Sequence, residues 1–228
     1  MVVLDAEQSR HLSRVLRLGV GARVVLFDGR GKEAEAEVQS LQPAGVVLKV
    51  VQELKVQGES GLSLTLGLGL AKGDAMDKVV SQATEMGVRK ICAFISSRSE
   101  RVSAERAARR LARWQRLSLE ALKSCRRSYA PEIGPIMDFA EVLPGPEEEK
   151  LLFWEEAEPG GIRGVLSGKR PESVRLLIGP EGGFGPEEVS QAQEQGYRVV
   201  SLGPRRLKVE TAALAALTIL QLAWGDLS

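Results

Sequence analysis

The sequence contains no asparagine, one histidine and two cysteines among its 228 residues. Because His11 is the only histidine, histidine-rich metal sites are excluded, and a Ser-His-Asp triad would have to be built around that one residue. Cys92 and Cys125 are too few for a disulfide framework and form no Cys-x-x-Cys pair, so we expect both to be reduced. The sequence predicts no metal site.

Long apolar segments are also missing. No run approaches the ~20 apolar residues that a transmembrane helix needs. The N-terminal residues 1–5 lack the basic start and the apolar stretch of a signal peptide. We therefore expect a cytoplasmic protein without a membrane partner. Apolar residues make up 43% of the chain, which is enough for a hydrophobic core.

Positive charge is concentrated in one segment of a chain whose net charge is only +1. Residues 98–127 contain ten basic and three acidic residues, a net charge of +7. A basic block in an otherwise acidic chain indicates a surface for a polyanion. The alternative is a solvated helix face, but few acidic residues lie between these cations to pair with them.

Residues 1 to about 55 are predicted to be rich in β-structure. Short apolar runs are separated by turn signals, which favours a small barrel. The segment before them has apolar residues at helical spacing and basic residues on the other side. The apolar runs are 22–27, 34–38 and 46–51, the turns are 28–31 and 42–45, the helix is 9–18, and a polar linker is 53–61.

From residue 62 onward, strand and helix patterns alternate, which predicts an α/β fold with a mostly parallel sheet covered by helices. We expect residues 131–149 to be irregular. The last helix is apolar almost all round, so it should be buried in the core or in a subunit interface. The predicted strands are 62–71, 88–95, 151–154, 174–178 and 199–202, and the predicted helices are 74–87, 103–126, 186–195 and 211–224.

A glycine-rich turn between the first of these strands and the first helix, Gly67–Gly73, has the spacing GxGxxxG. This is neither the GxGxxG of a dinucleotide site nor a P-loop, and no acidic residue ends a following strand to hold a ribose. Close packing is the favoured explanation for these glycines. A nicotinamide-dependent oxidoreductase that uses this turn is the rival hypothesis.

Two further glycine-rich turns follow strands near the C-terminal end. The first is Ile178-Gly179-Pro180-Glu181-Gly182-Gly183-Phe184, and the second is Leu202-Gly203-Pro204-Arg205-Arg206-Leu207-Lys208-Val209-Glu210-Thr211-Ala212. Loops at the carboxyl ends of parallel strands form the usual ligand crevice of an open α/β sheet. Glycines let the backbone approach the ligand, and the apolar side chains suit a flat group such as adenine.

These two motifs resemble the hallmark motifs of the SPOUT methyltransferases, and more narrowly those of the RsmE family of 16S rRNA (uridine-N3) methyltransferases. Residues 10–17, 77–88, 97–101 and 113–114 also resemble that family, so the likeness covers nearly the whole chain. The chain departs from the family at residues 120–127, where Lys123 lies, and at Arg206 and Lys208. These changes keep or raise positive charge, which is consistent with one activity.

The resemblance implies an α/β fold whose C-terminal SPOUT-type, mostly parallel sheet carries a trefoil knot, preceded by a small N-terminal PUA-like β-barrel. It implies a PUA-like RNA-binding domain over residues 1–60 and a methyltransferase domain over residues 61–228. It further implies a homodimer that uses S-adenosyl-L-methionine to methylate N3 of a uridine in 16S rRNA or the 30S subunit. A non-catalytic RNA-binding or assembly protein, and a methyltransferase for another RNA, are the alternatives.

The same resemblance supplies the expected site residues. Glu181 and Glu210 are candidates for the base that removes the uracil N3 proton, although each could instead have a local structural role. Arg205 and Arg206 would face the uracil oxygens. The expected cofactor-binding residues are Phe153, Trp154, Ile178, Gly179, Pro180, Glu181, Gly182, Ser201, Leu202, Gly203, Leu207, Val209 and Ala212. The expected RNA-binding residues are Arg10, His11, Arg14, Arg17, Arg98, Arg101, Arg126 and Arg127.

Overall fold

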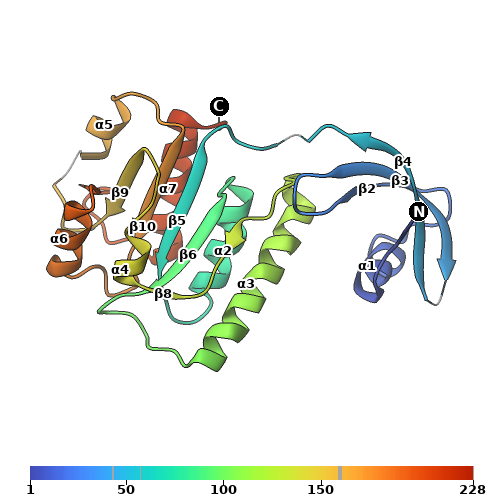
Figure 1. The fold of residues 1–228 in the computed structure, drawn as a ribbon, viewed down its shortest axis with the longest axis horizontal. Helices are drawn as coiled ribbons and strands as arrows, with labels where there is room; N and C mark the ends of the chain where they lie inside the picture. Colours follow the sequence, from blue (N-terminus) through green and yellow to red (C-terminus); the bar gives the residue numbers. More distant parts are fainter. Residues whose placement is uncertain (43, 57, 159–160, 228) are drawn as a thin grey trace. The chain divides into compact units, whose positions relative to one another are not determined.

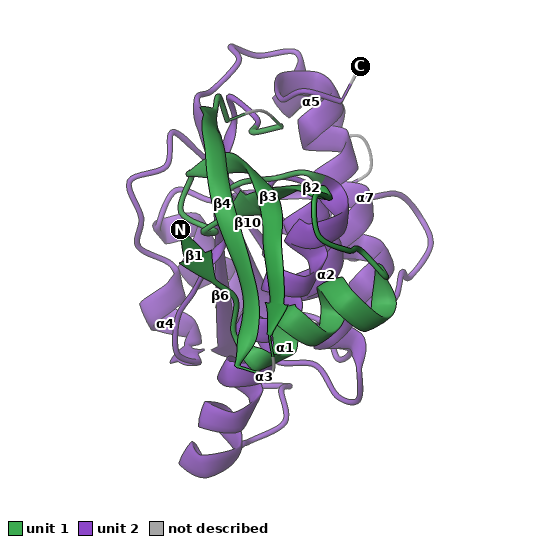
Figure 2. Ribbon diagram, turned by 90° about the vertical axis from the view of Figure 1, so that its right-hand side faces the viewer, with its two compact units in different colours: residues 1–59, 126–129 green, residues 60–125, 130–228 purple. Residues whose placement is uncertain are grey.

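The computed structural model describes residues 1–42, 44–56, 58–158 and 161–227 (Figure 1). The chain divides into two compact units, which Figure 2 colours separately. Unit 1 consists of Met1–Glu59 and Arg126–Tyr129, and unit 2 of Ser60–Cys125 and Ala130–Ser228. Among the described residues, no helix combines the length and the apolar character needed to cross a bilayer.

Unit 1 is built on a four-stranded antiparallel sheet in the order β1-β4-β3-β2. One face of β3 and β4 carries buried apolar residues at every second position, as a half-buried strand requires: Ala36 and Val38 on one strand, Val46 and Leu48 on the other. The β-rich character predicted for this region is confirmed as a small antiparallel sheet, and the closure of its strands into a barrel stays a prediction. Its strands are β1 (Val2–Val3), β2 (Arg23–Phe27), β3 (Glu33–Gln42) and β4 (Gly45–Leu54).

The helix predicted over residues 9–18 begins earlier and ends sooner. α1 (Ala6–Arg10) starts at Asp5, whose carboxylate accepts a hydrogen bond from the Gln8 N–H at 2.7 Å. It continues into a π-helical turn, η1 (His11–Val15), and packs through the buried Leu12. The chain then turns at Arg17, which has a φ of 54°.

The sheet of unit 2 has the order β11-β9-β10-β5-β6-β7, with the short β8 also paired to β6, and its strand pairs are parallel. The predicted mostly parallel α/β fold is thus confirmed, whereas the trefoil knot stays a prediction. The strands are β5 (Ser63–Gly69), β6 (Lys90–Ile95), β7 (Glu132–Ile133), β8 (Met137–Asp138), β9 (Glu149–Phe153), β10 (Ser173–Ile178) and β11 (Arg198–Val200).

Helices cover both faces of this sheet (Figure 1). Alternate strand residues face opposite layers: Ile91 belongs to the core cluster that includes residues of α2, α3, α5 and α7, and the adjacent Cys92 belongs to the cluster that includes residues of α4 and α6. Of these helices α4 and α5 were not predicted, and α4 lies with β7 and β8 in the segment expected to be irregular. The bounds are α2 (Ala75–Glu85), α3 (Ala104–Cys125), α4 (Phe139–Val142), α5 (Gly161–Leu166), α6 (Pro186–Glu194) and α7 (Val209–Trp224).

The last helix is less buried than its composition predicts. One stripe of α7, from Val209 through Leu217 to Trp224, is buried against unit 2. The opposite face is also apolar, yet Leu222 is 66% exposed there. The helix therefore has a second apolar face that the fold of one chain leaves open.

Candidate functional site

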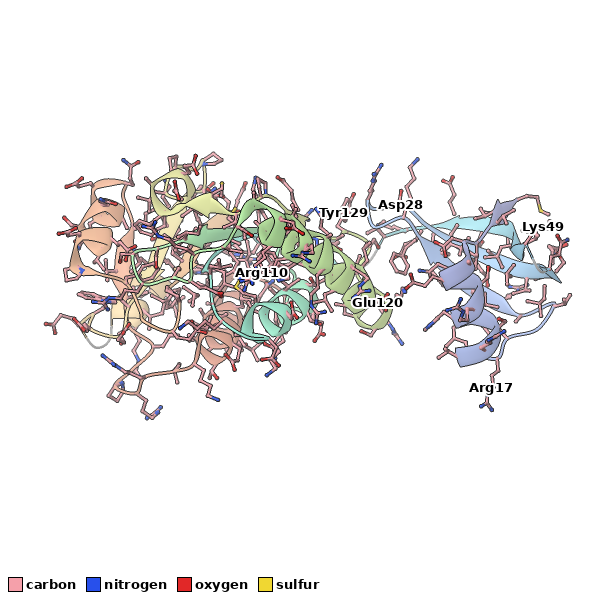
Figure 3. All side chains as sticks on the ribbon, turned by 90° about the horizontal axis from the view of Figure 1, so that it is seen from below. Arg17, Asp28, Lys49, Arg110, Glu120 and Tyr129 are labelled. Carbon is pink, nitrogen blue, oxygen red and sulfur yellow. The ribbon has the colours of Figure 1, made fainter. Side chains whose placement is uncertain are left out.

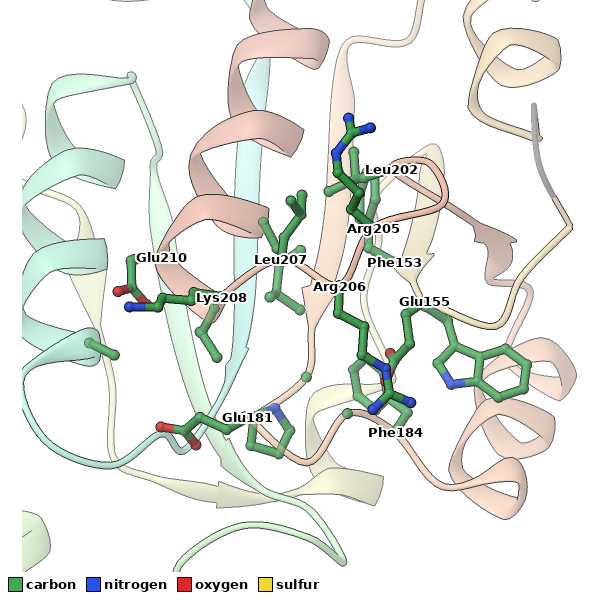
Figure 4. A pocket seen from close by; sticks show the side chains of 18 of the residues that line it. Phe153, Glu155, Glu181, Phe184, Leu202, Arg205, Arg206, Leu207, Lys208 and Glu210 are labelled. Carbon is green, nitrogen blue, oxygen red and sulfur yellow. The ribbon is translucent and has the colours of Figure 1, made fainter.

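A pocket of about 520 Å³ lies in unit 2 at the carboxyl ends of the parallel strands (Figure 4). This is the edge where open α/β sheets place their ligands. The walls come from the ends of β9 and β10, from Trp154 and Glu155 just after β9, from the starts of α2 and α7, and from three further loops. We name them the β5–α2 loop (residues 70–74), the β10–α6 loop (residues 179–185) and the β11–α7 loop (residues 201–208).

The β10–α6 loop is held by hydrogen bonds within itself and to a neighbouring segment. The Gly183 N–H donates to the Pro180 carbonyl at 2.8 Å, and Gly183 adopts a φ of 69°, which favours glycine. Glu181 Oε1 accepts a hydrogen bond from the Lys72 N–H at 2.8 Å. Glu181 therefore fastens this loop to the β5–α2 loop while its side chain stays largely exposed.

The β11–α7 loop turns sharply at its start. The Gly203 N–H donates to the Ser201 hydroxyl oxygen at 3.1 Å, and Gly203 has a φ of 107°. Beside it, the Trp154 N–H donates to the Val200 carbonyl at 2.9 Å, which joins the ends of β9 and β11. The two glycine-rich motifs and the end of β9 thus lie together around one cavity.

Most of the expected cofactor-binding residues line this pocket, and Gly182 and Ser201 are the exceptions. The residues that do so are Phe153, Trp154, Ile178, Gly179, Pro180, Glu181, Leu202, Gly203, Leu207, Val209 and Ala212. Seven other lining residues were not predicted. Those of the β5–α2 loop follow a parallel strand, but only the strand order, which puts β5 beside β10, brings that loop to the two glycine-rich motifs. The missed lining residues are Lys72, Asp74, Ala75, Glu155, Gly183, Phe184 and Lys208.

Two of the three glycines in Gly67–Gly73 support close packing, whereas Gly73, which has a φ of 63°, has open space around the position of a Cβ. A Cβ at Gly67 would lie 2.2 Å from Leu177 Cδ2, and one at Gly69 would lie 2.5 Å from the Pro180 nitrogen. These two glycines let β5 approach β10 and the loop that follows it. Their contacts agree with the packing explanation that the sequence analysis favoured over a dinucleotide site.

Charged groups lie on two sides of the pocket, with Leu207 between them (Figure 4). On one side are Glu181, Lys208 and Glu210. On the other, the guanidinium of Arg206 is directed towards Glu155 and Phe184, whereas that of Arg205 points away from them, towards the top of the view near Leu202. All four expected catalytic residues, Glu181, Arg205, Arg206 and Glu210, line the pocket.

Lys78 carries an electrostatic link to this site. Its Nζ lies 3.1 Å from Asp74 Oδ2, an ion pair between exposed side chains at the start of α2. The hydrogen bond and charge of Asp74 raise the pKa of Lys78 above its ordinary value, and the charge of Glu210 adds a smaller effect in the same direction. The charge of Lys78 therefore lies within electrostatic reach of Glu210, which lines the pocket.

The expected RNA-binding residues differ in exposure. Arg10, Arg14 and Arg17 of unit 1 are exposed, His11 is half-buried, and Figure 3 shows Arg17 directed away from the ribbon. Arg126 is also exposed. Arg127 is 3% exposed and its Nη2 lies 3.0 Å from Glu59 Oε2, so its guanidinium is committed inside unit 1. This burial contradicts a direct contact between Arg127 and RNA.

In unit 2, the expected RNA-binding residues are the exposed Arg98 and Arg101. The Arg98 Nη1 donates to the Gly182 carbonyl at 2.8 Å, so part of its guanidinium is engaged with the β10–α6 loop. No group of three or more potential metal ligands occurs within the described ranges.

Comparisons with known proteins match both units. A family model described as an RNA methyltransferase domain matches residues 58–221, and one described as an RNA methyltransferase PUA domain matches residues 4–51. The ribosomal RNA small subunit methyltransferase E of Synechocystis is 31% identical over 95% of this chain and 71% of its own. The enzyme of the same name from Bacillus subtilis is 26% identical over 94% of this chain and 87% of its own.

Solved structures give the same result. The ribosomal RNA small subunit methyltransferase E from Neisseria gonorrhoeae, crystallised with S-adenosyl methionine, superimposes with a TM-score of 0.88 at 34% identity. The alignment covers 100% of this chain and 93% of the other.

Proposed function

Since the chain belongs to the RNA methyltransferase family, we propose that it transfers the methyl group of S-adenosyl-L-methionine to N3 of a uridine in the 16S rRNA of the small ribosomal subunit. The observation that carries the proposal is that both glycine-rich motifs line one pocket together with the end of β9. We place the reaction in the cytoplasm, where ribosomal subunits are found.

The residues present fit S-adenosylmethionine. The pocket volume of about 520 Å³ is within the range of small-molecule sites, roughly 300–1,000 Å³. Ile178, Leu202 and Leu207 offer apolar surface for an adenine ring, and the glycine loops offer backbone N–H and C=O groups for its edges. The carboxylates of Glu155, Glu181 and Glu210 offer negative charge to a cationic ligand.

The bound cofactor supplies an electrophilic methyl group, and the remaining chemistry falls to this chain. Uracil N3 carries a proton that must leave before the nitrogen can form a bond to carbon. Glu181 and Glu210 lie on the same side of the pocket and are the two candidates to accept that proton. Arg206, on the other side, is placed to stabilise negative charge that develops on the uracil oxygens.

RNA capture uses exposed arginines of both units. Phosphate contacts of this kind fix register rather than read sequence, and the target base must leave its stack to reach the methyl group. The match of residues 4–51 to a PUA domain supports a role of unit 1 in RNA binding. The arginines proposed here are Arg10, Arg14, Arg17, Arg98, Arg101 and Arg126; Arg127 is removed because it is buried.

The protein acts as a homodimer in this proposal. The outer face of α7 is apolar, and an exposed leucine there, Leu222 at 66%, gains from burial against a second copy. A symmetric pair would bury the same helix face on both partners.

Radiolabelled methyl transfer tests the function. The protein is incubated with methyl-labelled S-adenosylmethionine and, in separate reactions, with 30S subunits from cells that lack the modification, 50S subunits and tRNA. We expect label in the 30S reaction alone. Label in tRNA or 50S RNA would support methyl transfer to RNA but contradict 16S rRNA as the substrate. RNA binding without any transfer would support the alternative of a non-catalytic assembly protein.

A further inference from the structure

Glu188 is a buried carboxylate whose contacts reach beyond its own helix. It is the third residue of α6 and is 7% exposed. Its Oε2 accepts a hydrogen bond from the Gly185 N–H at 2.8 Å, which caps the helix locally. Two more hydrogen bonds come from Ser97, 91 positions away in the chain. The Ser97 N–H donates to Oε1 at 2.8 Å, and the hydroxyl donates to Oε2 at 3.0 Å.

Helix capping alone does not explain the bonds from Ser97. The free N–H groups of the first turn favour an acidic residue there. One carboxylate oxygen is enough for this interaction, and the other can stay in water. Burial removes that water, so each oxygen needs a protein donor. Both oxygens of Glu188 receive one from Ser97. The carboxylate therefore bridges α6 to the segment that follows β6, the β6–α3 loop (residues 96–103).

The two segments joined by Glu188 follow strands that are not neighbours, because β5 lies between β6 and β10. Arg98 supports the same junction through its hydrogen bond to the Gly182 carbonyl. A Cβ at Gly182 would lie only 2.9 Å from Arg98 Cβ, so the two loops are in direct contact. Since most of the β10–α6 loop lines the pocket, a shift of this junction changes the pocket wall.

We propose that Glu188 is a positioning residue for methyl transfer: its bridge to Ser97 holds the β10–α6 loop in the conformation that binds S-adenosylmethionine. Glu188 does not line the pocket itself, so it acts through the loop. The inference rests on the proposed function, because it takes this pocket as the cofactor site. Glu188 belongs to neither glycine-rich motif and does not line the pocket, yet the inference gives it a measurable role.

The test compares three variants of the full chain: Glu188→Ala, Glu188→Gln and, as the matched control, Glu187→Gln. Glu187 is the preceding residue of the same helix turn and is exposed. S-adenosylmethionine is titrated calorimetrically into each protein well below its unfolding midpoint, and circular dichroism verifies the fold. We expect Glu188→Ala to raise the Kd about tenfold, Glu188→Gln to raise it less because one acceptor oxygen remains, and Glu187→Gln to match the wild type.

A merely structural role would lower the unfolding midpoint and leave the Kd of the folded protein unchanged. If Glu188→Ala does not fold, Glu188→Gln and Ser97→Ala decide, and wild-type Kd values for both would overturn the proposal. The wild-type titration separates the two levels of the account. A wild type that does not bind the cofactor contradicts the proposed function and the inference with it. If the wild type binds the cofactor and the folded variants bind it with the same Kd, only the inference is contradicted.

Discussion

Arg205 and Arg206 are neighbours in the β11–α7 loop, but their guanidinium groups point in different directions (Figure 4). Both are exposed, so neither is held by burial. The sequence could not assign different roles to these two arginines because they are adjacent and of the same type. The directions of their side chains distinguish them. Only Arg206 is directed towards the side where Glu155 and Phe184 lie.

We predict that Arg206→Ala lowers kcat by about 10²–10³ and changes the Kd of S-adenosylmethionine little, because the arginine acts on charge that forms only during the reaction. Arg205→Ala is the control and should retain most of the activity. Single-turnover methylation of 30S subunits gives the rate, and calorimetry gives the Kd. An equal loss in both variants, or a loss confined to cofactor affinity in Arg206→Ala, would contradict this assignment.

A buried ion pair between Arg175 and Glu147 contributes to the stability of the fold. Arg175 and Glu147 form a buried pair, each side chain 8% exposed, with Nε to Oε2 at 2.9 Å and Nη2 to Oε1 at 3.0 Å. Burial acts to raise the pKa of the Glu147 carboxyl, but the hydrogen bonds from Arg175 and Thr65 outweigh it, and the pKa lies below its ordinary value. The Arg175 Nη1 also donates to the Val142 carbonyl at 2.8 Å.

We predict that Glu147→Gln lowers the free energy of unfolding by about 3 kcal/mol at neutral pH, because it leaves the Arg175 charge buried without a counter-charge. A carboxyl with a lowered folded-state pKa stabilises the fold above its unfolded pKa, near 4.5, and that contribution is lost as the pH falls through the folded-state value. Urea denaturation from pH 7 to pH 3 should therefore show the two proteins converging at low pH. A constant difference across that range would exclude this cause.

At the scale of elements, close packing of β5 against the β10–α6 loop sets the shape of the pocket. Gly69 allows it, since any side chain there would meet Pro180 backbone and ring atoms at 2.5 Å. By contrast, a Cβ at Gly134, between β7 and β8, would meet nothing within 4 Å. The two glycines thus provide a matched pair of substitutions in the same unit.

We predict that Gly69→Ala destabilises the protein by about 1–3 kcal/mol and weakens S-adenosylmethionine binding, because the loop must move away from the added methyl group. Gly134→Ala should change both quantities little. Thermal unfolding with and without the cofactor measures the two effects together. Unchanged cofactor binding in Gly69→Ala would show that this contact does not shape the pocket.

The elements also show what could be predicted from the sequence. The longer strands and helices were predicted because β-branched runs, apolar periodicity and closing glycines are local; Gly87 and Gly196 end α2 and α6 with φ values of 82° and 83°. The short elements β7, β8, α4 and α5 span too few residues for a period to show. Arg127 was misjudged because its partner, Glu59, lies 68 positions away. The β5–α2 loop could be placed at the pocket only once the strand order was known.

At the scale of the whole molecule, two family models match the chain: one for an RNA methyltransferase PUA domain over residues 4–51 and one for an RNA methyltransferase domain over residues 58–221. The pocket and the exposed face of α7 both belong to unit 2. The proposed division of labour gives RNA contacts to both units and cofactor binding to unit 2.

We predict that Leu222→Glu converts the proposed dimer to a monomer, because a carboxylate would be buried on both sides of a symmetric interface. Leu41→Glu is the control, since Leu41 is also an exposed leucine, 46%, but lies on β3 of unit 1. Sedimentation velocity distinguishes the states. A dimeric Leu222→Glu, or a monomeric wild type, would contradict the proposed interface.

The central claim is methylation of uracil N3 in 16S rRNA, and mass spectrometry of nucleosides tests it most directly. Undermethylated 30S subunits are incubated with the protein and S-adenosylmethionine, and the 16S rRNA is then digested to nucleosides and compared with a reaction lacking the cofactor. We predict that 3-methyluridine appears only in the complete reaction. A methyl group on cytidine or on ribose, or no new methylated nucleoside with active cofactor binding, would contradict the account.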